Sequence, residues 1–91
     1  MNETQPAEPD PPRTLAEAHQ VLAGVRPPRK APLSEWLTYY QRSAAVYAEV
    51  AEIDRGHHHE ALFMAERERQ HAKEIKTQIS SQRPNGEASG E

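Results

Sequence analysis

The chain has 91 residues, of which 27% are charged, with a mean hydropathy of −0.96 and a formal net charge of −3 at pH 7. This length allows one domain at most, and so little apolar material can build only a thin core. No run of residues approaches the roughly 18 consecutive apolar positions of a transmembrane helix, and the acidic, Pro-rich start lacks the features of a secretory signal. We therefore expect a cytoplasmic protein without a membrane partner. Zero cysteines exclude disulfides and thiolate metal sites, and the net negative charge argues against a nucleic-acid partner.

The two ends of the chain have the composition of disordered segments. Residues 1–12 combine four prolines with acidic and polar side chains, which cannot bury enough apolar surface to offset the cost of ordering. In residues 83–91, Pro84 forbids helix continuation and Asn85-Gly86 favours a turn. Residues 13–82 are then left to form a single helical domain.

A first helix is predicted over about residues 14–25. Thr14 followed by Glu17 has the capping-box pattern, in which each side chain satisfies a free amide at the helix start. An apolar stripe repeats at three- and four-residue spacing through Leu15, Ala18, Leu22 and Val25. Gly24 and the prolines that follow end the pattern. The helix is too short to be stable alone, so it must pack on the rest of the chain.

Residues 26–32 form a basic, Pro-rich connector that we expect to be extended, because each proline restricts both itself and its predecessor. A second helix is predicted over about 33–55, opened by Pro32 or Ser34. A third helix should start at His57 or His58 and run over about 57–81. Gly56 fits the left-handed position just past a helix end, and the short connection predicts an antiparallel hairpin.

The two long helices carry apolar ladders that match when read in opposite directions. The ladder of the second helix consists of Leu33, Leu37, Tyr40, Ala44, Tyr47 and Ala51. The ladder of the third, in reverse order, consists of Ile79, Ile75, Ala72, Glu68, Ala65 and Ala61. Five of these six pairs suit close apolar packing, with alanines opposite tyrosines, and Glu68 is the exception. The fold class is therefore all-α: a long antiparallel helical hairpin with a shorter N-terminal helix packed on it.

A second apolar stripe on the second helix implies that this helix is covered on more than one face. The first helix can fold back and cover part of it, but it is too short to reach all of it. We therefore expect an apolar patch to stay partly exposed near the hairpin corner. The residues of this predicted interaction surface are Val50, Ile53, Phe63 and Met64.

The corner also carries three consecutive histidines and a glutamate: His57, His58, His59 and Glu60. Imidazole and carboxylate are suitable ligands for zinc or nickel, so an alternative hypothesis is a metal- or pH-responsive module. Neighbouring residues of a helix point about 100° apart, so at most two of the three histidines can serve one ion together. The competing interpretation is that these side chains cover the corner and bond to the end of the preceding helix. No cofactor is expected on that interpretation.

No phosphate loop, nucleophile elbow or paired-carboxylate cleft is visible, so we expect no enzymatic activity. The turn around Gly56 resembles the inter-helix turn of a tetratricopeptide repeat, but no second copy occurs. The stretch AEIDRGHHHEAL, residues 51–62, resembles a segment of a group of small uncharacterised actinobacterial helical proteins. This resemblance covers about residues 14–79. It implies a bacterial cytoplasmic setting and an accessory or regulatory role, with no activity to transfer.

The leading hypothesis from the sequence is a small non-enzymatic helical module for protein–protein interaction. It would act through the apolar surface near the corner, either on a protein partner or by self-association as a homodimer.

Overall fold

The computed structural model describes residues 11–82, which form three α-helices, one short 3-10 helix and no strand. The α-helices are α1 (Leu15–Gly24), α2 (Leu33–Ile53) and α3 (His58–Gln82), and the 3-10 helix is η2 (Arg55–His57). The predicted all-α fold, a long hairpin with a shorter N-terminal helix, is confirmed. Disorder was expected for residues 1–12 and 83–91, and of these only Pro11 and Pro12 lie within the described range. These two residues have no regular secondary structure. None of the described helices is both long and apolar enough to span a membrane.

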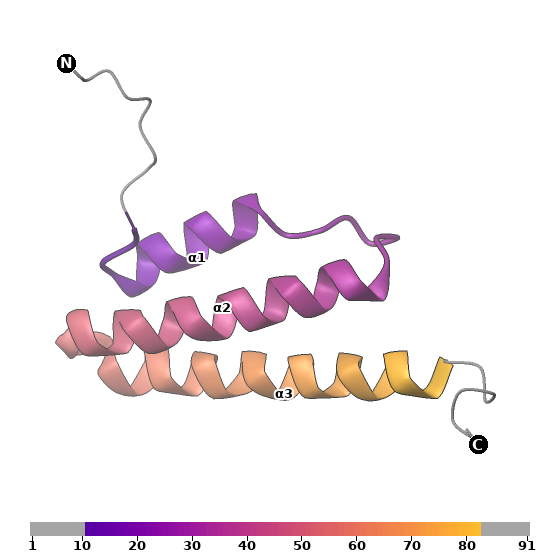
Figure 1. Ribbon diagram of the computed structural model, residues 1–91. Coiled ribbons are helices and arrows are strands. Elements are labelled where there is room, and N and C mark those ends of the chain that lie inside the picture. The colour runs from indigo at the N-terminus through magenta and orange to yellow at the C-terminus, as the bar shows by residue number, and fades with distance from the viewer. Residues whose placement is uncertain (1–10, 83–91) are drawn as a thin grey trace, which may run out of the picture.

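The three helices lie side by side, with α2 between α1 and α3 (Figure 1). Most tertiary contact is between α2 and α3, and the main contacts of α1 are with α2. Each helix runs antiparallel to the next one along the chain (Figure 1). The arrangement leaves α1 and α3 as the two outer helices, with little direct packing between them.

The capping box at the start of α1 is present, with one change in its partners. The amide of Glu17 donates to Thr14 Oγ1 at 3.0 Å, as predicted. The carboxylate of Glu17 accepts a hydrogen bond at 2.8 Å from the amide of Arg13, one residue before the expected Thr14 amide. The helix ends where expected, and the amide of Val25 donates to Leu22 O at 3.2 Å.

The prediction of an extended connector is wrong for its second half. It turns at Arg29-Lys30, and the amide of Ala31 donates to Pro28 O at 2.9 Å. No amide of residues 26–28 donates a local backbone hydrogen bond, and two of these residues are prolines, which have no amide to donate. The turn lets α1 fold back onto α2. Pro32 then caps α2, and its carbonyl accepts from Glu35 and Trp36.

The ladder predicted for the hairpin is where α2 and α3 are buried against each other. The ladder residues buried on the two helices are Ala44, Tyr47, Ala51, Ala61, Ala65, Glu68 and Ala72. The ladder residues toward the open end of the hairpin are half-buried, namely Leu33, Leu37, Tyr40, Ile75 and Ile79. The ladder residues nearest the corner are mostly alanines, which permit close packing, and those toward the open end are mostly larger side chains.

The corner differs from our prediction for Gly56. No residue in the range 11–82 has a positive φ, so Gly56 does not occupy the left-handed position. The amide of Asp54 donates to Val50 O at 2.8 Å and ends α2, and the amide of His57 donates to Asp54 O at 2.9 Å. A tight 3-10 turn therefore reverses the chain without the left-handed glycine of a Schellman cap.

Helix α1 docks on α2 through Ala18 and Leu22, which are buried in one cluster with Tyr39 and Val50. The expectation that Val50 stays partly exposed is therefore wrong: Val50 is 1% exposed because it belongs to this cluster. Ile53, three residues later, is 49% exposed. Docking of α1 thus removes Val50 from the surface predicted for interaction.

Candidate functional site

A side chain at the corner fixes the start of α1. Asp54 Oδ2 accepts a hydrogen bond from the amide of Leu15 at 2.9 Å, and His57 Nδ1 lies 2.9 Å from the same oxygen. The amide of Leu15 is one of the free donors of a helix start, and the positive end of the helix dipole favours a carboxylate there. The bond from Leu15, with a smaller contribution from His57, lowers the pKa of Asp54. This contact holds the first turn of α1 next to the first turns of α3.

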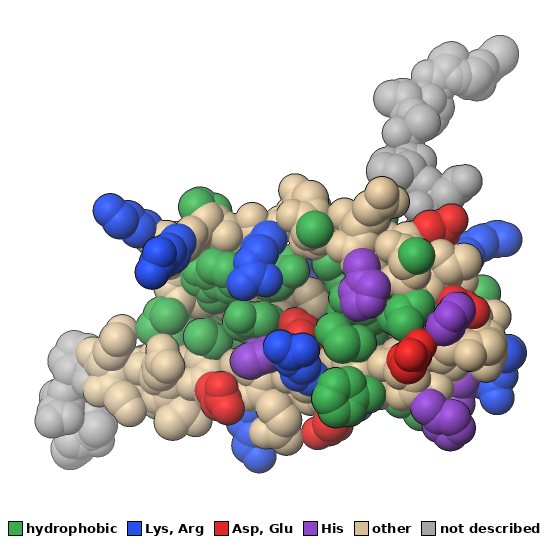
Figure 2. Space-filling model, turned by 180° about the vertical axis from the view of Figure 1, so that it is seen from behind, with side chains coloured by type: hydrophobic (Ala, Val, Ile, Leu, Met, Phe, Trp, Pro, Cys, Tyr) green, Lys and Arg blue, Asp and Glu red, His purple; other side chains and the backbone are tan. Residues whose placement is uncertain are grey.

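A groove of about 400 Å³ lies between these two helix starts. Its walls come from the outer helices, and its lining residues are Leu15, His19, His59, Glu60, Phe63 and Met64. Phe63 is 65% exposed and Met64 is half-buried. Figure 2 shows hydrophobic side chains gathered between α1 and α3 on this face, with histidines and charged side chains around them. We call this feature the α1–α3 groove.

His19 is fixed by a buried tyrosine of α2. His19 Nδ1 lies 2.7 Å from the hydroxyl of Tyr47, and the two rings meet edge to face at 5.4 Å. Burial raises the pKa of Tyr47, and the nearby carboxylate of Glu68 raises it further. The tyrosine is therefore a neutral hydroxyl near pH 7, and it orients the imidazole in the wall of the groove.

Farther along the same helices, an aromatic cluster surrounds the open end of the hairpin. Trp36 and Tyr40 have ring centroids 5.7 Å apart, and the ring of His71 stacks on Tyr40 at 4.8 Å. The guanidinium of Arg26 lies over the ring of Trp36 at 5.1 Å, a cation–π contact that ties the connector to α2. Burial is the main cause that raises the pKa of Tyr40.

Glu68 is the exception predicted in the ladder, and it is buried there, at 8% exposure. Its carboxylate forms no hydrogen bond or ion pair with any residue in the range 11–82, although its charge raises the pKa of both Tyr40 and Tyr47. Glu68 lies near both tyrosines, and His71, three residues later on α3, stacks on Tyr40 alone. Glu68 is thus a charged residue inside an otherwise apolar interface.

The predicted corner cluster separates into two pairs. His57 bonds to Asp54, and His58 Nδ1 lies 2.8 Å from the carbonyl of Ala51 at the end of α2. His59 and Glu60 point instead into the α1–α3 groove. Within residues 11–82, no three His, Asp or Glu side chains are arranged to hold a metal ion. The rings of His58 and His59 meet edge to face at 5.3 Å, but the four side chains do not all converge on one point, as helical geometry requires for consecutive residues.

The predicted interaction residues also separate. Phe63 and Met64 lie together in the groove, Val50 is buried, and Ile53 is exposed but is not part of the groove lining. Leu15 and His19, which were not among the predicted interaction residues, form the opposite wall. Their four-residue spacing, which places two side chains on one helix face, was the available signal.

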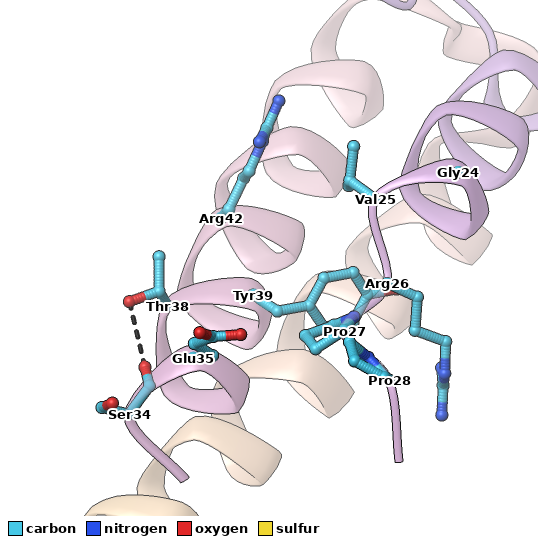
Figure 3. A pocket seen from close by; sticks show the side chains of 10 residues that line it. All are labelled: Gly24, Val25, Arg26, Pro27, Pro28, Ser34, Glu35, Thr38, Tyr39 and Arg42. Carbon is cyan, nitrogen blue, oxygen red and sulfur yellow. Dashed lines mark hydrogen bonds between the residues drawn. The ribbon is translucent and has the colours of Figure 1, made fainter. Parts of the chain in front are cut away.

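Two other hollows are more polar. One, of about 600 Å³, lies between the end of α1, the connector and the first turns of α2. Its three charged side chains are Arg26, Glu35 and Arg42, and the two arginines extend away from each other (Figure 3). The second lies between α2 and α3 and includes Glu66, Arg69, Lys73 and Lys76. Neither has an exposed aromatic side chain like Phe63, so we take the α1–α3 groove as the candidate site.

Comparison of the chain with protein-family profiles, with curated proteins and with solved structures gives no match. The fold and the site therefore define the class by themselves: a small three-helix protein with an open apolar groove between its outer helices.

Proposed function

We propose that this chain is a non-enzymatic protein–protein interaction module that binds another protein chain through the α1–α3 groove. The observation that carries the proposal is the exposure of Phe63, a residue that is 65% accessible in a molecule with few large apolar side chains. Exposed apolar side chains gathered beside a groove are typical of recognition surfaces, and aromatic side chains contribute strongly to them.

The shape and chemistry of the groove support a helical partner. Its two walls are faces of α1 and α3, and an amphipathic helix can pack its apolar side between two such faces. Histidines and Glu60 at the edge can bond to polar side chains of the incoming helix. A partner there would complete a four-helix arrangement. The cytoplasmic, actinobacterial setting and the accessory role remain part of this proposal and rest on the sequence resemblance.

The test compares two single substitutions on α3 in cells that make the protein naturally. Phe63→Ser removes the groove's exposed ring, and Leu62→Ser removes an exposed side chain (39%) that does not line the groove. Neither side chain is buried, so both variants should fold with similar stability. We expect bound protein, whether a second copy or another chain, to be lost with Phe63→Ser and retained with Leu62→Ser. Equal retention by both variants would contradict the proposal.

A second candidate function, a response to pH at the corner, is favoured by one contact. His57 and the amide of Leu15 share the same oxygen of Asp54, so the protonation of His57 affects the group that fixes α1. The other charged or titratable groups of this corner are His58, His59, Glu60 and Arg55, which pairs with Glu52. Amide exchange of α1 between pH 5 and pH 8, compared with that of His57→Gln, tests this function. Identical profiles would dismiss it. Within residues 11–82, no comparable contact favours the hypothesis that the corner cluster binds zinc or nickel.

A further inference from the structure

The exposed face of α3 in the groove has a self-complementary pattern of charged and apolar side chains. Glu60, Phe63, Met64 and Arg67 follow one another at spacings of three, one and three residues. At 100° per residue, the four positions lie within an arc of about 100° on one side of the helix. Glu60, Phe63 and Met64 line the groove, and Arg67 is close enough to Tyr40 and Tyr47 for its charge to oppose part of the rise in their pKa values. From the N-terminal to the C-terminal side, the face therefore presents an acidic residue, two apolar residues and a basic residue.

If the direction of the helix is reversed, the same order results with the acidic and basic residues exchanged. Glu60 lies one turn before the apolar pair and Arg67 lies one turn after it. In an antiparallel pair of identical helices centred between Phe63 and Met64, each Glu60 meets an Arg67, and each Phe63 meets a Met64. The contact would hold two equivalent ion pairs around two thioether–aromatic contacts.

We propose that the occupant of the α1–α3 groove is a second copy of this chain, paired through α3 in this antiparallel register. The proposal rests on the proposed function of the same groove and names its partner. Charge complementarity identifies the second copy, because a two-fold interface requires a self-complementary surface. The pairing also places the exposed ring of Phe63 against Met64 of the other copy, beside the wall formed by Leu15 and His19.

The opposite side of α3 offers a matched control. Glu66 and Arg69 form an exposed ion pair at 3.1 Å, three residues apart, facing away from the groove. Substitutions there change the same formal charges on the same helix without touching the proposed interface. Their effect on association should be small, because exposed ion pairs contribute little on their own.

The experiment is sedimentation equilibrium of the full chain at low salt, with charge reversals. We expect a reversible dimer for the wild type. Glu60→Arg alone and Arg67→Glu alone should each weaken it on the order of tenfold, because two attractive pairs become repulsive. The double reversal restores opposite charges in the same register and should restore the dimer. Glu66→Arg, the charge-matched control, should dimerise like the wild type.

Circular dichroism of each variant separates loss of association from loss of helix, since Glu60→Arg also opposes the helix dipole in the first turn of α3. Arg67→Glu lies mid-helix and has no such effect. A wild type that stays monomeric at all concentrations would overturn the second-copy proposal. A dimer whose association none of the charge reversals changes would also overturn it. So would a doubly reversed variant that dimerises as weakly as the single variants.

These outcomes are distinct from a failure of the proposed function. If the wild type is monomeric while Phe63→Ser still releases a different protein that Leu62→Ser retains, the groove binds another chain and only the second-copy proposal fails. If neither association nor capture depends on Phe63, both proposals fail.

Discussion

Asp54 Oδ2, at the end of α2, accepts a hydrogen bond at 2.9 Å from the amide of Leu15, 39 residues earlier. One residue thus ends a helix with its backbone and starts another with its side chain, since its own amide closes α2 on Val50. The contact determines where α1 begins relative to the corner. Through that placement it also sets the spacing of the two groove walls.

Removal of this carboxylate should loosen α1. In Asp54→Ala the amide of Leu15 loses its partner, and we expect faster hydrogen exchange at Leu15 and along the first turn of α1, with the hairpin unchanged. Asp54→Asn keeps an acceptor oxygen and should have a smaller effect. Glu52→Ala is the control, because within residues 11–82 its carboxylate pairs only with Arg55, and both side chains are exposed. Exchange rates that do not distinguish Asp54→Ala from Glu52→Ala would show that the contact does not hold α1.

Acid should release the same contact. The hydrogen bond from Leu15 lowers the pKa of Asp54 below its ordinary value of 3.8, so the folded state binds this proton less tightly than the unfolded state. The stabilisation is therefore complete above about pH 4 and is lost as pH falls through the folded pKa. We expect protection of α1 amides to fall below pH 4 in the wild type but to vary less in Asp54→Asn.

Glu66 titrates in a similar range, because hydrogen bonds from Gln70 and Arg69 lower its pKa as well. It lies on α3, on the side away from α1, so Glu66→Gln should leave the acid sensitivity of α1 in place. If Glu66→Gln, and not Asp54→Asn, flattened the pH profile of α1, the assignment to Asp54 would be refuted.

Tyr47→Phe should destabilise the fold by about 1 kcal/mol, the typical net contribution of a hydrogen bond, because its hydroxyl pairs with His19. Denaturant unfolding measures the loss. A double-mutant cycle with His19→Ala should show a coupling of similar size, since either substitution removes the same bond. Tyr40→Phe is the control, because its hydroxyl has no hydrogen bond to any residue in the range 11–82. A coupling near zero would mean that the bond does not orient His19.

Ser43→Ala should stabilise the protein. Ser43 is 1% exposed, and its Oγ is buried without a partner among the residues that the structure describes. Removal of an unsatisfied hydroxyl recovers about 1 kcal/mol, to which the higher helix propensity of alanine adds. Ser80→Ala, on the exposed side of α3, measures the propensity gain alone. Thermal unfolding should show a larger rise in midpoint for Ser43→Ala; an equal or smaller rise would indicate that the hydroxyl is satisfied.

The three helices could be predicted from the sequence because their signals are local. Periodic apolar residues, the Thr14 cap and the prolines of the connector set the helix limits to within about two residues. The ladder on α2 and α3 followed from matching two periodic patterns about one corner. Even Glu68 was placed correctly as the exception. Local rules of this kind need no knowledge of the remaining chain.

The groove could be predicted only in part, because it depends on how α1 docks. The sequence indicated Phe63 and Met64, which α3 exposes in any such hairpin. It did not indicate that Ala18 and Leu22 would cover Val50 or that Leu15 and His19 would form a wall. Those outcomes depend on the turn at Arg29-Lys30 and on the bond between Asp54 and Leu15, neither of which has a periodic signature. The conformation of Gly56 was missed for a similar reason: a 3-10 turn and a left-handed cap both accept glycine.

Because α1 makes its main contacts with α2 alone, the groove exists only while α1 is docked. Occupancy of the groove and docking of α1 are therefore linked equilibria, and each favours the other by the same free energy. A molecule with α1 undocked has only one of the two groove walls. The apparent affinity of the groove for its partner therefore decreases as the fraction of molecules with α1 docked decreases. Asp54, which is not among the lining residues, would thus control binding strength from outside the contact surface.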